Sequence, residues 1–222
     1  MRKFLFMACL AISQISFAGE VTFRLSEIDR TLDSIGAHAK QYPLRFESKA
    51  QREQIEQSLK QMLEFLDAAS AEYPDNPAIL FRQAFANGMG HNLDFPGCAE
   101  KAIEAYERVI DIEPENQRAN YYYGAFLSGT TLFKKSIPYL EKAIQLGETD
   151  AHYTLAFVYI KLGNPKMALP EFKAYLVSDP DNRTAKKMVS EIESNTLSTQ
   201  FHETPPLNGG VIYESSSIQP SK

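Results

Sequence analysis

The hydrophobic and polar positions between residues 120 and 180 follow one helical pattern that is written twice. Apolar and small residues recur thirty-two positions apart, in the pairs Gly124 and Ala156, Ser136 and Ala168, Leu140 and Phe172, and Ala143 and Tyr175. A fixed period of this size is typical of a stacked helical repeat. The pattern therefore predicts an all-α solenoid built from antiparallel helix pairs.

The same register can be followed towards the N-terminus. Residues of the same kinds recur at intervals of forty and then thirty-four positions, in the rows Met62, Ala102, Ser136; Leu66, Tyr106, Leu140; and Ala69, Val109, Ala143. We expect helical repeats over residues 48–181, beginning with a degenerate unit whose second helix spans residues 48–73 after an N-cap at Ser48. Residues 182–195 predict a helix with one apolar and one charged face, which is how the open end of a solenoid is capped.

The last unit resembles a tetratricopeptide repeat. It contains Leu155-Ala156-x2-Tyr159, followed by Ala168-x3-Phe172 and then Pro180, which follow the pattern of that family. The resemblance implies a right-handed, non-enzymatic interaction scaffold without a cofactor, in which the first helix of each pair lines a concave groove. In this register the groove positions are Phe81, Phe85, Tyr121, Ala125, Tyr153 and Phe157.

The predicted groove is strongly aromatic, since five of these six positions carry rings. Such a surface suits an apolar or aromatic peptide segment, or stacking against sugar rings. Alternatively, the rings pack on one another or are covered by the ends of the chain. Family members that bind a C-terminal carboxylate use Lys, Asn and Arg at these and adjacent positions, and the neighbours Arg82, Tyr122 and Thr154 do not match that set. We therefore expect no binding of chaperone tails.

The link between the helices of unit 77–114 is six residues longer than in the later units, which predicts a long loop from Asn87 to Cys98. Polar residues surround it and form a candidate loop cluster: Gln83, Asn87, His91, Asn92 and Asp94. One interpretation is a ligand or metal site using His91, Asp94 and Cys98. The other, which we favour, is that Gln83 and Asn87 satisfy loop backbone groups. One histidine and one carboxylate make a poor metal set, so no metal site is expected.

The N-terminus has the pattern of a secretory signal peptide over residues 1–18. Arg2 and Lys3 precede the apolar run from Phe4 to Ile15, and Ser16-Phe17-Ala18 supplies small residues before a cut after Ala18. We expect an exported protein, periplasmic or secreted, with no membrane span after cleavage; the alternative is an uncleaved anchor.

The two remaining segments of the chain, residues 19–47 and 196–222, differ from the repeats in composition. Residues 19–47 predict an N-terminal segment, with a short extended piece from Val21 to Leu25 and one helix capped by Ser26. After residue 195 the chain is rich in Ser, Thr, Pro and Gly, so residues 196–222 predict a disordered tail.

The net charge of the chain and its lack of catalytic motifs argue against several classes of function. The formal net charge is −5, and it becomes more negative once Arg2 and Lys3 are removed, which argues against nucleic acid and an anionic membrane surface as partners. Cys98 alone remains after cleavage, so we expect a buried thiol and no intrachain disulfide. No catalytic motif is present. The sequence therefore predicts a scaffold of the cell envelope that binds a peptide or protein partner, with a carbohydrate-binding envelope scaffold as the alternative.

Overall fold

The structure, a computed structural model, describes residues 17–40 and 44–196. These residues form nine helices and no strand: α1 (Phe17–Ala39), α2 (Lys49–Glu72), α3 (Pro77–Asn92), α4 (Cys98–Ile112), α5 (Gln117–Gly129), α6 (Phe133–Gln145), α7 (Asp150–Lys161), α8 (Pro165–Ser178) and α9 (Arg183–Glu193). No described helix has the length and apolar character needed to cross a membrane. The all-α prediction is confirmed, whereas residues 1–16 of the predicted signal peptide and residues 197–222 of the predicted tail lie outside the described residues.

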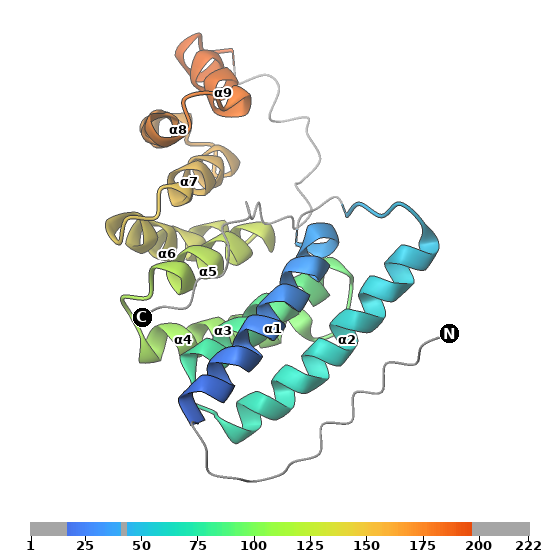
Figure 1. The fold of residues 1–222 in the computed structure, drawn as a ribbon. Helices are drawn as coiled ribbons and strands as arrows, with labels where there is room; N and C mark the ends of the chain where they lie inside the picture. Colours follow the sequence, from blue (N-terminus) through green and yellow to red (C-terminus); the bar gives the residue numbers. More distant parts are fainter. Residues whose placement is uncertain (1–16, 41–43, 197–222) are drawn as a thin grey trace.

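The helices stack as hairpins. Figure 1 shows α4 to α9 rising one above another, with α1 and α2 beside α3 at the N-terminal end. The pairs α3 with α4, α5 with α6 and α7 with α8 make the most extensive contacts, and each pair then packs on the next. This is the arrangement that the thirty-two-residue period predicts.

Small residues let the paired helices approach closely. Ala102 and Ala168 on the second helices are completely buried. At Gly124 an added Cβ would lie 2.7 Å from Cγ of Leu140 and 3.1 Å from the backbone nitrogen of the same residue. Packed interiors leave no room for such an atom, so the repeat requires a small side chain here.

Polar N-cap residues in the turns mark where several of the helices begin. Ser48 accepts a hydrogen bond from the backbone N–H of Gln51, as predicted. Asn76, Asn116 and Asn182 do the same at the starts of α3, α5 and α9, each accepting from an N–H two or three residues later. These caps satisfy backbone donors that have no partner inside the helix. They therefore fix where these helices begin.

The first helix differs from the prediction. The extended piece expected from Val21 to Leu25 is wrong, because the backbone is helical from Phe17 and Ser26 lies inside the helix. The apolar alternation was ambiguous: Val21 and Leu25 are also one helical turn apart. Helix α1 contacts both α2 and α3, so it takes the place of a first helix in the degenerate unit whose second helix is α2.

Two polar contacts hold α1 along α3. The guanidinium of Arg82 donates to both carboxylate oxygens of Asp29, at 2.7 and 2.6 Å, and both residues are buried. Near the other end of α1, the Asn92 side chain donates to the backbone oxygen of Ala39 at 2.9 Å. Both pairs are 53 residues apart, so the two helices run parallel in a constant register.

Helix α9 closes the C-terminal end of the stack. Ala185 and Met188 are buried against α8, whereas Lys186 and Lys187 are exposed. A helix with one apolar and one charged face is what the last repeat of a solenoid needs, since it has no further neighbour to cover it.

Candidate functional site

The first helices of the hairpins place the six predicted groove residues at three levels of the stack. At the levels of α3 and α5, Phe81, Phe85, Tyr121 and Ala125 are all buried. At the level of α7, Tyr153 and Phe157 are half-buried. The six positions therefore do not present one uniformly accessible surface, and of these residues only the α7 pair is partly exposed.

Tyr122 of α5 lies at the centre of the buried part. Its ring lies edge-on to Phe81 with centroids 5.5 Å apart, and to Phe85 with centroids 5.6 Å apart. The ring of Tyr121 lies 5.4 Å from it, and the guanidinium of Arg118 is 5.2 Å from the centre of the Phe81 ring. Edge-to-face aromatic pairs and cation–π contacts of this kind stabilise a packed interior. At this level the rings pack on one another, which was one of the two interpretations the sequence left open.

The α7 level has a different environment. Tyr153 and Phe157 lie 4.9 Å apart, centroid to centroid. Behind them are two buried rings of α8: Phe172, 5.1 Å from Phe157, and Tyr175, 4.8 Å from Tyr153. The pair is therefore held from behind by α8 and is itself only half-buried. This is the geometry of an aromatic platform, which we name the α7 platform and define as Tyr153 and Phe157.

Two half-buried carboxyl groups lie at the start of α7. Burial raises the pKa of Glu148, and the nearby Asp150 raises it further. Burial also raises the pKa of Asp150, with Asp179 as the second cause. Removal from water disfavours the charged form of a carboxylate, and a cation placed beside it restores that form. Glu148 also accepts a hydrogen bond from the side chain of Gln117 at 3.3 Å, and the positive charge of Arg118 acts against the rise in its pKa. Asp150 lies three residues before Tyr153 on the helix, so it is the carboxyl group better suited to receive a further cation beside the α7 platform.

Neither of these two carboxyl groups was predicted from the sequence as part of a site. Glu148 stands in the repeat where Pro114 stands in the preceding unit and Pro180 in the following one. The departure of Glu148 from a recurring proline was the signal available. Asp150 gave none, because an acidic residue in the first turn of a helix is ordinary.

The predicted loop from Asn87 to Cys98 is wrong. Helix α3 continues to Asn92 and has 16 residues, against 13 in α5 and 12 in α7, so three or four of the six additional residues lengthen the helix. Gly90 permits close packing, because an added Cβ there would lie 2.6 Å from Sγ of Cys98. Glycine here marks a close approach between helices rather than a flexible loop.

The structure does not bring the residues of the predicted loop cluster together into one site, and they contact different partners. Gln83 donates to a carboxylate oxygen of Asp67 at 2.8 Å, and Asn87 donates to the backbone oxygen of Gln83 at 2.8 Å, so neither bonds loop backbone as we expected. The His91 ring packs on Phe126 with centroids 5.9 Å apart, Asn92 bonds Ala39, and Asp94 is exposed. The described residues contain no group of three or more His, Cys, Asp or Glu side chains that could hold a metal ion.

Cys98 is a buried free thiol, as expected. Burial raises its pKa, with the positive charge of Lys101 acting in the opposite direction. Since the thiolate is the reactive form, a raised pKa makes this cysteine a packing residue rather than a nucleophile.

Comparisons with known proteins agree with this architecture. The family model described as a tetratricopeptide repeat matches residues 149–182. Among solved structures, MamA aligns with a TM-score of 0.56 at 17% identity, covering 69% of this chain and 88% of MamA. TTC0263, a thermophilic TPR protein in Thermus thermophilus, aligns with a TM-score of 0.52 at 15% identity, covering 79% of this chain and 95% of its own.

No curated protein matches the sequence, and at such low identity a structural likeness establishes the fold alone. The chain is an all-α solenoid of the tetratricopeptide type, and its α7–α8 hairpin is a recognisable tetratricopeptide repeat.

Proposed function

We propose that this protein is a non-enzymatic interaction scaffold that binds a peptide segment of a partner protein on the α7 platform. Tetratricopeptide repeats generally mediate protein–protein interaction, and solenoids use the concave surface formed by their repeats for this purpose. The observation that carries the proposal is the half-buried pair Tyr153 and Phe157, supported by the buried rings of Phe172 and Tyr175.

The small apolar area of the α7 platform and the carboxyl groups near it indicate which peptide segment would bind best. Covering about 50 Å² more on each of two rings contributes roughly 2–3 kcal/mol at about 25 cal/mol/Å². That gain is smaller than the cost of association, so apolar contact alone would give very weak binding. A charged contact must add to it, and we infer that the half-buried Asp150, with Glu148 nearby, receives a cation of the ligand. The preferred segment therefore carries an aromatic or large apolar residue near a lysine or arginine.

Binding can be measured through the ligand, because this chain contains no tryptophan. Peptides selected from a random library on the immobilised protein, each with one tryptophan, are titrated with the protein while tryptophan fluorescence is followed. We expect Phe157→Ser to weaken binding at least about tenfold, the loss produced by about 1.4 kcal/mol. The matched control is Phe65→Ser on α2, where the ring is 46% exposed and far from α7 in the stack.

Two outcomes would contradict the proposal. One is equal affinity for the wild type and the Phe157→Ser variant, with thermal unfolding showing both to be folded. The other is selective binding to a glycan array with no peptide enriched from the library, which would favour the carbohydrate-binding alternative.

We further propose that the scaffold works in the cell envelope after export. The charged start, the apolar run and Ser16-Phe17-Ala18 support cleavage after Ala18. The intact mass of protein recovered from the periplasm or the medium should correspond to a chain that begins at Gly19. Recovery only of a species that retains Met1 would rule out this processing.

A further inference from the structure

The two edges of the C-terminal hairpins carry opposite charge. The turns within the hairpins, between α5 and α6 and between α7 and α8, lie at one edge, and the turns between hairpins lie at the other. Residues 116–140 and 151–170 contain no Asp or Glu. Six of the eight acidic residues between positions 113 and 181 lie at the turns between hairpins, namely Glu113, Glu115, Glu148, Asp150, Asp179 and Asp181, whereas Glu141 and Glu171 lie within α6 and α8. The formal net charge of the whole chain, −5, does not reveal this separation of acidic and basic residues.

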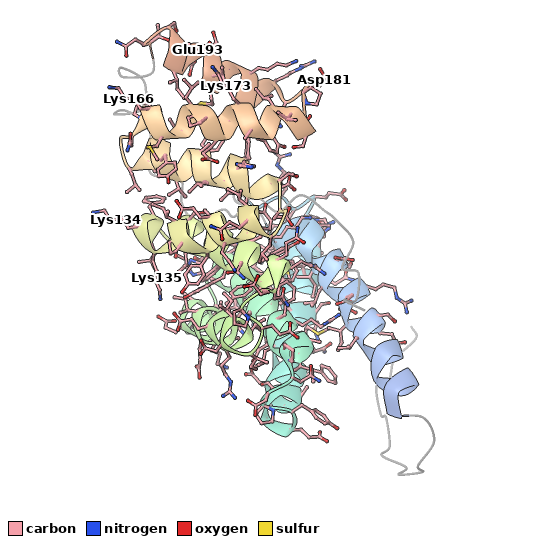
Figure 2. All side chains as sticks on the ribbon, turned by 90° about the vertical axis from the view of Figure 1, so that its left-hand side faces the viewer. Lys134, Lys135, Lys166, Lys173, Asp181 and Glu193 are labelled. Carbon is pink, nitrogen blue, oxygen red and sulfur yellow. The ribbon has the colours of Figure 1, made fainter. Side chains whose placement is uncertain are left out.

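Lysines occupy the edge that lacks acidic residues. Figure 2 shows Lys134, Lys135 and Lys166 along one side of the stack and Asp181 on the opposite side. Lys134 and Lys166 are exposed repeat equivalents, thirty-two residues apart, and neither forms an ion pair with any described side chain. Lys161 is half-buried at the end of α7, where burial lowers its pKa. By contrast, Lys135 pairs with Glu107 at 2.8 Å.

Apolar side chains project beside these lysines. Leu132, in the turn before α6, is 42% exposed, and Met167, in the first turn of α8, is 46% exposed. Both belong to the small set of large hydrophobic residues that the described structure leaves exposed. We name this surface the turn edge and define it by Leu132, Lys134, Lys135, Lys161, Lys166 and Met167.

We propose that the turn edge rests on an anionic lipid surface. The residues of the turn edge lie at the tips of two neighbouring hairpins, so they can contact a flat surface at the same time. An extended peptide, by contrast, needs a groove to hold it. Lysines attract anionic headgroups, and short apolar side chains at the same level enter the interface between headgroups and acyl chains. This surface is separate from the α7 platform, and either can fail without the other.

The negative net charge of the chain does not oppose this contact strongly. Helix α6 has 13 residues, which at about 1.5 Å per residue separates the two edges by about 20 Å. The Debye length at physiological salt is about 8 Å, so the acidic edge is screened from a membrane that touches the turn edge. The acidic edge also disfavours the reverse orientation. The net charge, from which no anionic membrane partner was expected, averages over two edges of opposite sign.

The test is co-sedimentation of the full chain with two kinds of vesicle, phosphatidylcholine alone and phosphatidylcholine mixed with phosphatidylglycerol. The apolar run from Phe4 to Ile15 can enter both kinds, so the measured quantity is the ratio of the two partition coefficients. Each lysine near the surface contributes about fivefold to binding, the equivalent of about 1 kcal/mol. The Lys134→Glu/Lys166→Glu variant should therefore lose at least about 30-fold of the preference for anionic vesicles.

The control variant makes the same change in net charge elsewhere. Lys49→Glu/Lys186→Glu alters lysines on α2 and α9 whose side chains are 89% and 55% exposed. It should change the preference much less, and high salt should abolish the preference of the wild type. Circular dichroism confirms that each variant is folded.

Three results would overturn the proposal. These are no preference for anionic vesicles, equal losses in the two double variants, or no vesicle binding together with binding of a poly-glutamate peptide that requires Lys134 and Lys166. The last result would assign the turn edge to an acidic protein segment instead.

Discussion

Replacing Asp29 with alanine is expected to lower the free energy of unfolding by about 3–5 kcal/mol. The substitution leaves the Arg82 guanidinium buried without its carboxylate, because Arg82 is only 5% exposed and donates to both oxygens of Asp29. The remaining bond of Arg82, to the backbone oxygen of Ala78, cannot balance the charge. Urea denaturation followed by circular dichroism measures the loss.

The matched control removes both charges. In the Asp29→Leu/Arg82→Met variant no unpaired charge is buried, and apolar replacement of a buried pair is often neutral or stabilising. Its stability should therefore lie close to that of the wild type and well above that of Asp29→Ala. If Asp29→Ala unfolds within about 1 kcal/mol of the wild type, α1 is not held on α3 by this ion pair.

Phe172→Ala should destabilise the protein by a similar amount, about 3–5 kcal/mol, through a cavity at the last hairpin. The ring is completely buried and contacts the rings of Phe157 and Tyr153 at centroid distances of 5.1 and 6.1 Å. Differential scanning calorimetry should show a clear decrease in Tm.

Val177→Ala on the same helix is the control, since Val177 is 85% exposed. Its effect should be below about 0.5 kcal/mol, as for surface substitutions in general. Equal effects of the two substitutions would mean that α8 is packed in a register different from the one described.

The sequence predicted the repeats well because their information is local. The period places Ala168 and Phe172 inside the stack, and both are completely buried. Ser48 was identified as an N-cap from its position before an apolar stripe, and it accepts the expected hydrogen bond. Helix periodicity and capping depend on residues only a few positions apart, so a single sequence contains them.

The features that the sequence did not predict depend on distant partners. Nothing near Asp29 indicates a bond to a residue 53 positions away. The segment from Asn87 to Cys98 was predicted as a loop because the repeat spacing is six residues longer there, yet α3 continues to Asn92 and Gly90 lies where α3 closely approaches Cys98. Likewise, the aromatic stripe was visible in the sequence, but the burial of Phe81 and Phe85 involves Tyr122 of α5, whose ring packs against both of them.

The spacing of the contacts also has a consequence for how the chain reaches its native state. Ion pairs and hydrogen bonds between side chains of neighbouring helices, such as Gln83 with Asp67 and Lys101 with Asp67, join residues 16 to 34 positions apart. Chains dominated by such local contacts fold quickly. Helix α1 is the exception, since its polar bonds to α3 span 53 residues. If the chain crosses a membrane with its N-terminus leading, each later hairpin can form soon after it emerges, whereas α1 must wait until α3 has followed it.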